Sequence, residues 1–262
     1  MQDHNVTDSE QSIQDFDFAL ICDYFSALKR QGPGSEDTTL KALSFVNELP
    51  RDGLVADLGC GTGSSALTLA RHADVRVVAL DIFPAFVEAV RHRAAEMGLA
   101  DKVDARIGSM DALPFEPESL DMIWSEGAIY NVGFRHGLQM WHRYIKPGGY
   151  VAVTDATWLT PHRPAAIEHF WSEAYPEVEL TSAKVWAMEE AGYEPVATFV
   201  LPSRCWTEEF YHPQRLVQED FLSRHKSSPM AAELVANMRR EAQMYDCYGR
   251  YYGYAFYIGR RL

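Results

Sequence analysis

One run of residues, Val55-Ala56-Asp57-Leu58-Gly59-Cys60-Gly61-Thr62-Gly63, constrains the fold more than any other part of this chain. It is typical of a short buried strand that ends at an acidic residue and turns through three glycines into a helix. Glycines at alternate positions allow a sharp bend and leave no Cβ between the turn and a ligand. We therefore expect a strand–turn–helix unit whose turn contacts a bound molecule through Gly59, Gly61 and Gly63.

The spacing of these glycines differs from that of dinucleotide-binding folds. Those folds use G-x-G-x-x-G, and counted from Gly59 the last glycine position of that pattern falls on Ser64. The chain also lacks a second nucleotide-binding half. A nicotinamide-dependent oxidoreductase that binds NAD is therefore the alternative interpretation, not the leading one.

Strands and helices are predicted to alternate through the middle of the chain, which indicates an α/β fold with a mainly parallel sheet and helices on both faces. The expected strands are Leu54–Leu58, Arg76–Asp81, Asp104–Gly108, Leu120–Ser125 and Tyr150–Thr154. The expected helices between them are Ser64–His72, Pro84–Met97 and Phe134–Tyr144.

The two ends of the chain are predicted to add helices to this sheet. Residues 1–37 form an N-terminal arm and a lid helix in this interpretation, and a second helix carries Leu40 to Leu49. Residues 38–262 form the main domain, with a helical cap inserted at about 202–250. Two more strands, Glu194–Leu201 and Tyr252–Ile258, flank helices at Glu208–Leu222 and Ala231–Met244.

Composition excludes several classes of protein. The chain has 262 residues, 47% hydrophobic, which suffices for a sizeable core. The net charge of −13 argues against a nucleic-acid partner. Four well-separated cysteines predict no zinc site and no disulfide scaffold, hence a cytoplasmic protein without a metal. Neither a signal peptide nor a membrane-spanning stretch is predicted.

The end of the second strand supplies a candidate ligand-binding acid. Ligands of open α/β sheets lie beyond the carboxyl ends of the strands. The carboxylate of Asp81, at such an end, can accept both hydrogen bonds of a ribose diol. The alternative is an acid that precedes the helix beginning at Pro84.

Together these residues resemble motif I and the following strand ends of class I methyltransferases that use S-adenosylmethionine. The branch that contains the ubiquinone and menaquinone biosynthesis C-methyltransferases is especially similar, over roughly Leu40 to Ala156. Three segments also resemble bacterial methyltransferases of unassigned substrate: Tyr24–Gly34, Trp124–Asn131 and Tyr251–Tyr254. The resemblance implies a Rossmann-like seven-stranded sheet whose last strand is antiparallel, with S-adenosylmethionine at its carboxyl edge.

The resemblance also implies roles for individual side chains. Asp57 and the glycine loop cradle the methionine half of the cofactor, and Asp81 binds the ribose. Asp111 accepts a hydrogen bond from the adenine amino group, or else caps a turn ahead of Pro114. The remaining expected cofactor contacts are Ile82 and Met110 on the adenine faces, Ser125 near the sulfonium, and Arg30 on the methionine carboxylate.

Glu126 and Tyr130 are the candidate catalytic residues, because the fourth strand ends beside the expected sulfonium. Glu126 either steers a positive charge or acts as a base, and Tyr130 orients the acceptor. The expected reaction is in-line methyl transfer to a small-molecule acceptor, with S-adenosylhomocysteine as the second product. A non-catalytic module that binds the cofactor is a further alternative. The tyrosines between Tyr245 and Tyr257 fit an acceptor pocket and a homodimer interface equally well.

Overall fold

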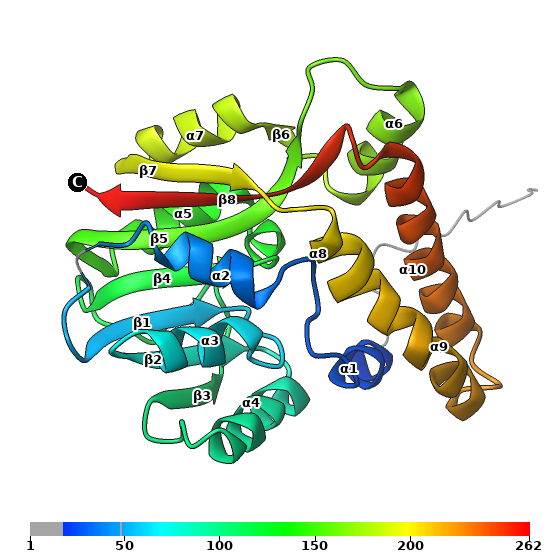
Figure 1. Cartoon of the computed structure of the whole chain (residues 1–262), viewed down its shortest axis with the longest axis horizontal. Helices are drawn as coiled ribbons and strands as arrows, with labels where there is room; N and C mark the ends of the chain where they lie inside the picture. Colours follow the sequence, from blue (N-terminus) through cyan, green and yellow to red (C-terminus); the bar gives the residue numbers. More distant parts are fainter. Residues whose placement is uncertain (1–17, 48) are drawn as a thin grey trace, which may run out of the picture.

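The computed structural model describes residues 18–47 and 49–262, and its centre is a twisted sheet (Figure 1). The strands are β1 (Gly53–Leu58), β2 (Val75–Asp81), β3 (Val103–Ile107), β4 (Leu120–Glu126), β5 (Ile145–Trp158), β6 (Glu179–Leu180), β7 (Tyr193–Val200) and β8 (Tyr252–Arg261). Their order is β3-β2-β1-β4-β5-β8-β7, and the short β6 pairs with β5. β8 runs antiparallel to both of its neighbours, β5 and β7, whereas the other strand pairs are parallel. The predicted α/β fold with an antiparallel last strand is confirmed.

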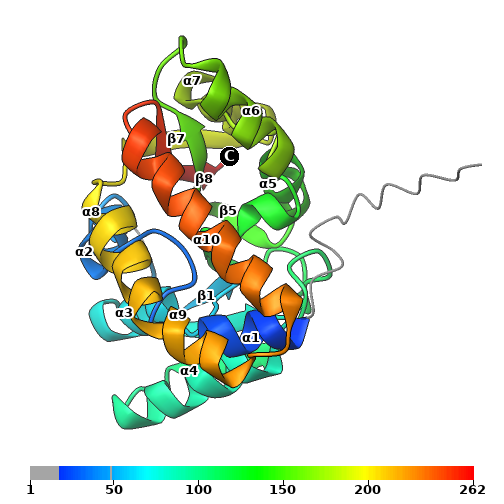
Figure 2. The same ribbon diagram turned by 90° about the vertical axis from the view of Figure 1, so that its right-hand side faces the viewer.

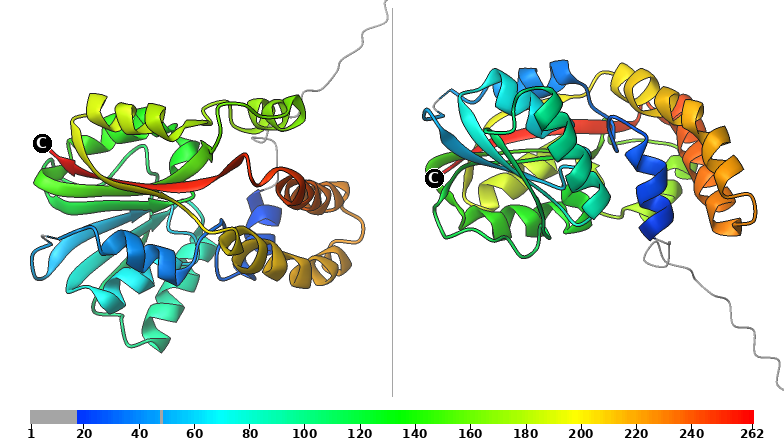
Figure 3. Two further views of the ribbon diagram at one scale, coloured as in Figure 1. Left: turned by 45° about the horizontal axis from the view of Figure 1, so that its top comes forward. Right: turned by 90° about the horizontal axis from the view of Figure 1, so that it is seen from below.

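Helices cover both faces of the sheet (Figure 3). One face carries α2 (Glu36–Leu43), α3 (Ser64–His72) and α4 (Pro84–Glu96), and the other carries α5 (Phe134–His142) and α7 (Thr181–Glu190). Separate apolar cores fill these two layers, the first around Leu69 and Val90 and the second around Leu138 and Trp141. This arrangement leaves the carboxyl edge of the strands free to carry polar groups.

A helical cap crosses that carboxyl edge (Figure 2). It consists of α8 (Arg204–Trp206), the π-turn η3 (Thr207–Tyr211), α9 (His212–Arg224) and α10 (Pro229–Tyr248). The N-terminal helix α1 (Phe18–Ser26) packs on α9 and α10, because Leu20 and Tyr24 share a small apolar core with Phe221 and Leu234. Helix α1 and the cap are therefore joined to each other as well as to the sheet.

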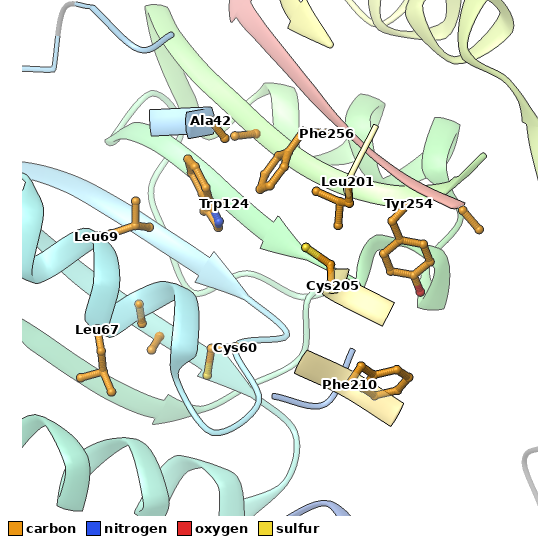
Figure 4. Close-up of a cluster of buried hydrophobic side chains, with 14 of the residues drawn as sticks. Ala42, Cys60, Leu67, Leu69, Trp124, Leu201, Cys205, Phe210, Tyr254 and Phe256 are labelled. Atoms are coloured by element: carbon orange, nitrogen blue, oxygen red, sulfur yellow. The ribbon is translucent and has the colours of Figure 1, made fainter. Parts of the chain in front are cut away.

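The first apolar core continues from the sheet into the base of the cap (Figure 4). Trp124 of β4 and Phe256 of β8 meet edge to face, with ring centroids 5.6 Å apart. Farther along, the ring of Trp206 stacks on Tyr245 at 4.7 Å and meets Tyr254 at 4.9 Å. These contacts fix the base of the cap against β8.

Several predicted boundaries were wrong. The strand β5 extends to Trp158, well beyond Thr154, because pairing with β8 continues along its whole second half. The second helix begins at Glu36, where Ser35 forms a capping box with Thr38, and it ends at Leu43. The expected helix Glu208–Leu222 is divided by the π-turn ahead of Pro213. Residues 1–17, which include most of the expected arm, and residue 48 lie outside the described residues.

Two helices and a short strand were not predicted: α6 (Ala165–Ala174), β6 and α7. The apolar residues of α7 have weak helical periodicity, and this helix buries Ala187 and Met188 together with the charged Lys184. In the described part of the chain, no helix combines the length and the hydropathy needed to cross a membrane.

Candidate functional site

The glycine loop between β1 and α3 adopts the sharp turn that its sequence predicts. Gly59, Gly61 and Gly63 all have left-handed backbone angles, with φ of 68°, 53° and 90°. A Cβ at Gly59 would strike Ala128 and lie 2.8 Å from Met110 Cε, and one at Gly61 would strike Gln31 Oε1. Neighbouring segments pack directly on this backbone, so side chains are excluded by both conformation and space.

Asp81 at the end of β2 is tied to the same loop. Its carboxylate accepts hydrogen bonds from the backbone N of Gly61 at 2.8 Å and from that of Phe83 at 3.0 Å. Burial raises the pKa of this carboxyl, which is 7% exposed. Each carboxylate oxygen has a second acceptor position, so two further donors, such as those of a diol, can still bind.

Asp57 lies beneath the loop and has an unsatisfied atom. Its side chain is fully buried, Oδ2 accepts from Ser65 Oγ at 2.7 Å, and Oδ1 has no hydrogen-bond partner among the described residues. Burial raises the pKa of Asp57 to about 7, with the charges of Glu126 and Asp81 adding to the effect. A buried carboxylate oxygen without a hydrogen bond lowers the stability of the fold. We therefore expect a donor from a ligand or a water at this position.

The segment after α1, residues 27–35, crosses the glycine loop as a strap. Gln31 Oε1 accepts from the backbone N of Thr62 at 2.9 Å, and Gln31 Nε2 donates to Thr62 Oγ1 at 3.1 Å. From the other side, Arg93 of α4 donates to the carbonyl of Thr62 at 2.9 Å. The strap is therefore fixed to the tip of the loop by side-chain hydrogen bonds.

Glu126 at the end of β4 anchors the strap. Its carboxylate accepts from Arg30 Nη1 at 2.9 Å, Thr39 Oγ1 at 2.6 Å and Trp124 Nε1 at 2.9 Å. The side chain is 5% exposed. Arg30 and Glu126, predicted for separate roles, are thus partners in one buried ion pair.

A cavity of about 60 Å³ lies between the strap and the glycine loop, lined in part by Arg30, Gln31, Gly61 and Glu126. The roles predicted for the residues around it remain predictions. Ser125 is fully buried and donates to the carbonyl of Leu58 at 2.8 Å. Farther out along the edge, Ile82 is 51% and Tyr130 44% exposed, Met110 is half-buried and Asp111 is exposed.

Beyond β4, a second group of buried polar side chains was not predicted. Lys184 forms an ion pair with Asp155 near the end of β5, and both side chains are almost completely buried. Tyr175 donates to the same Asp155 oxygen at 3.1 Å, whereas Asp155 Oδ1 has no partner among the described residues. The ring of Tyr130 lies 5.9 Å from that of Tyr175.

One signal for this group is present in the sequence. Asp155 directly follows the expected strand Tyr150–Thr154, and Asp57 and Asp81 likewise lie at or next to the ends of their expected strands. No local pattern identifies Lys184 as its partner. Among the described residues, no three His, Cys, Asp or Glu side chains converge in a way that could hold a metal ion.

The aromatic residues of the late segment pack mainly within the chain. Four of its tyrosines are buried, namely Tyr245, Tyr252, Tyr254 and Tyr257. Trp158, Trp171 and Trp206 are also buried, whereas His169 lies on the surface and pairs with Glu173 at 3.3 Å. Tyr24 of α1 donates to Gln214 at 3.0 Å and accepts from Gln218 at 3.1 Å.

Comparisons with known proteins agree with this geometry. Residues 55–149 match the family described as "Methyltransferase domain". The chain is 37% identical over 119 residues to sarcosine/dimethylglycine N-methyltransferase of Aphanothece halophytica, covering 45% of this chain and 43% of the relative. It is 29% identical over 107 residues to the ubiquinone/menaquinone biosynthesis C-methyltransferase of Geotalea daltonii, covering 40% and 46%. The chain thus spans less than half the length of these relatives.

A solved structure extends the similarity to the whole fold. A methyltransferase from Geobacter sulfurreducens, in complex with S-adenosylhomocysteine, superposes with a TM-score of 0.79 over 93% of this chain and 98% of that chain. At 19% identity this likeness shows the fold alone. Residues 55–149 of this chain therefore match a methyltransferase domain, and the chain is similar in sequence to the two methyltransferases named above and in fold to the solved one.

Proposed function

We propose that this protein transfers a methyl group from S-adenosylmethionine to a small-molecule acceptor. The observation that carries the proposal is the glycine loop itself, where three left-handed glycines lie between two buried carboxylates, Asp57 and Asp81. That combination leaves backbone, not side chains, facing a ligand and supplies acids for its amino and hydroxyl groups.

The residues present fit this cofactor. A Cβ at Gly61 would occupy the space next to the loop, and the orphaned Asp57 Oδ1 supports a nearby donor such as an ammonium group or a water bound to it. The cavity between loop and strap is too small for the whole cofactor. We infer that residues 30–34 move when the cofactor enters, as a lid would.

S-adenosylmethionine, when bound, supplies an electrophilic methyl carbon on a sulfonium. In our proposal Asp81 binds the ribose diol, and Ile82, Met110 and Asp111 surround the adenine. Three donors already occupy the Glu126 carboxylate, which favours a fixed negative charge near the sulfonium over a proton acceptor. Through this ion pair, Glu126 also holds Arg30 where it can reach the methionine carboxylate.

The exposed ring of Tyr130 suits the acceptor side of the reaction. Ser125, whose hydroxyl joins β4 to β1, contributes by keeping the two strand ends aligned. Catalysis then rests on alignment and exclusion of water, because a departing neutral sulfur needs no acid.

The names of the relatives support a small acceptor, since sarcosine and dimethylglycine are small molecules. A cytoplasmic location and a homodimer, both expected from sequence, stay part of this proposal. The non-catalytic alternative makes a different prediction, namely cofactor binding without turnover.

The proposal is tested by incubating the protein with S-adenosylmethionine and a panel of small amines, phenols and carbon acids. Formation of S-adenosylhomocysteine and of an acceptor one methyl group heavier is expected with at least one class. The matched control is Gly61→Val, which should produce neither. Binding of S-adenosylhomocysteine without any turnover would favour the non-catalytic alternative.

A further inference from the structure

Tyr130, the residue proposed for the acceptor side, lies in the short segment that follows β4. This segment begins at Gly127 and includes the turn η2 (Ile129–Asn131). The backbone N of Gly127 donates to Thr154 Oγ1 of β5 at 2.7 Å, so the start of the segment is fixed to the neighbouring strand. The side chain of Tyr130 is 44% exposed, and burial alone therefore does not fix its ring. Its orientation depends on the residues that contact it.

The ring of Tyr175 makes such a contact. The two ring centroids lie 5.9 Å apart and the planes are inclined at 62°, which is an edge-to-face arrangement. Tyr175 directly follows α6 and is buried, and its backbone N donates to the carbonyl of Trp171 at 2.8 Å. It thus gives the exposed ring of Tyr130 a surface on which to pack, provided that its own ring is held in place.

The hydroxyl of Tyr175 is held from the sheet. It donates to Asp155 Oδ2 at 3.1 Å, and Asp155 follows Thr154, the residue that pairs with Glu126 at the end of β4. Burial and then the charge of Asp155 raise the pKa of Tyr175, so the hydroxyl keeps the proton that it donates. A hydrogen bond from a hydroxyl to a carboxylate is charge-assisted and therefore stronger than a bond between two neutral groups.

Lys184 holds the Asp155 carboxylate. Its ammonium group forms an ion pair with Asp155 Oδ2, donates to the carbonyl of Glu177 at 3.2 Å and lies 4.4 Å from the centre of the Phe134 ring. The side chains of Lys184 and Asp155 are 0% and 1% exposed. In a site from which water is excluded, these contacts leave the carboxylate little freedom to turn. The contacts therefore run from α7 through the end of β5 to Tyr175.

We infer that Tyr175, held by Asp155 and Lys184, is a positioning residue that orients the ring of Tyr130 for the methyl acceptor. The inference rests on the proposed function, in which Tyr130 contacts the acceptor. A reaction that depends on alignment loses rate when the side chain that aligns the acceptor can turn away. Tyr175 acts through Tyr130 and not by contact with the cofactor. The alternative is a cluster that only joins α6 and α7 to β5.

The first test observes Tyr130 directly and needs no acceptor. The protein is labelled with fluorotyrosine, and the fluorine NMR signal of Tyr130 is the one that disappears in Tyr130→Phe. Tyr175→Phe keeps the ring and removes only the hydroxyl, and we expect the Tyr130 signal to shift toward that of free fluorotyrosine. The matched control, Tyr193→Phe, removes another buried hydroxyl, which donates to the carbonyl of Leu138 at 3.1 Å, and should leave the Tyr130 signal in place.

The second test is kinetic and uses the acceptor that the panel described above identifies. Tyr175→Phe should lower kcat/KM for the acceptor roughly tenfold and leave the KM for S-adenosylmethionine unchanged. In a Tyr130→Ala background the same change should have almost no further effect, because Tyr175 acts through Tyr130. Tyr193→Phe should change neither parameter.

The outcomes separate this inference from the proposed function. If the protein binds neither S-adenosylmethionine nor S-adenosylhomocysteine, the proposed function fails and the inference fails with it. If the protein binds them, but the Tyr130 signal is unchanged in Tyr175→Phe or moves equally in Tyr193→Phe, the inference is overturned while the proposed function stands. Equal kinetic losses with and without the Tyr130 side chain would overturn it as well.

Discussion

The two halves of the carboxyl edge are built on different principles. Around β1 and β2 the site consists mainly of backbone, since Gly59 and Gly61 contribute no side chain and Asp81 accepts from the main-chain N of Gly61 and Phe83. Beyond β4 it is made of side chains, where Lys184 pairs with Asp155 and Tyr211 with Glu241. A backbone site suits one invariant cofactor. A site made of side chains can differ between proteins that act on different acceptors, although they share the same sheet.

The largest expected effect lies in the side-chain half. Lys184→Met should lower the free energy of unfolding by about 3–5 kcal/mol, because it leaves Asp155 as an uncompensated buried charge. Chemical denaturation measures this. The control, Lys146→Met, breaks a more exposed pair with Asp121 and should cost about 1 kcal/mol or less. If the two variants lost the same free energy of unfolding, the Asp155–Lys184 pair would contribute no more to stability than a surface pair.

The next effect lies in the backbone half. Gly61→Val should weaken S-adenosylhomocysteine binding by roughly a hundredfold or more, about 2.7 kcal/mol, because the side chain both strains the loop and collides with Gln31 of the strap beside the proposed site. Gly98→Val is the matched control, since Gly98 also has a left-handed φ but no neighbour within 4 Å of a Cβ. Calorimetry on both variants separates backbone strain from loss of the site. A Gly61→Val protein that binds normally would refute the role of the loop.

A smaller effect is expected from Asp81, the acid that we propose binds the ribose. Asp81→Asn should weaken binding about tenfold, since a charge-assisted acceptor becomes a neutral one. The exposed change Asp101→Asn should have no effect. If Asp111→Asn weakens binding more than Asp81→Asn does, the proposed roles of the two acids, Asp81 on the ribose and Asp111 on the adenine, would have to be exchanged.

The most gradual effect is a pH dependence that comes from Asp57. Its pKa is raised from 3.8 to about 7 by burial, so between these values the folded protein binds more protons than the unfolded chain. The contribution of Asp57 to stability is therefore full below pH 4 and is lost as pH rises to 7, by at most about 1.4 kcal/mol per pH unit. Asp57→Asn should remove this slope from denaturation curves recorded between pH 4 and 8. An unchanged slope would show that Asp57 is already ionised there.

The same division explains what the sequence could predict. The strand β1, the glycine turn and α3 depend on residues within one short segment, so the pattern from Val55 to Gly63 was sufficient to predict them. The position of Asp81 followed from the strand period. These are local rules of conformation and pairing.

The half of the carboxyl edge beyond β4 could not be predicted from local sequence patterns. Glu241 and Tyr211 are brought together only by the packing of α10 against η3, and nothing near either residue in the sequence indicates the other. Glu126 was correctly placed at the end of β4, but its three hydrogen-bond donors come partly from Arg30 and Thr39, which the strap delivers. Tertiary packing, not local pattern, decides these partners.

The central claim is tested most directly by calorimetric titration of the wild-type protein with S-adenosylmethionine and S-adenosylhomocysteine, with NAD as the control ligand. The account predicts micromolar, one-to-one binding of both adenosyl ligands and no binding of NAD. Binding of NAD in preference to them, or of none of the three, would contradict the assignment of the glycine loop and of every site residue that depends on it.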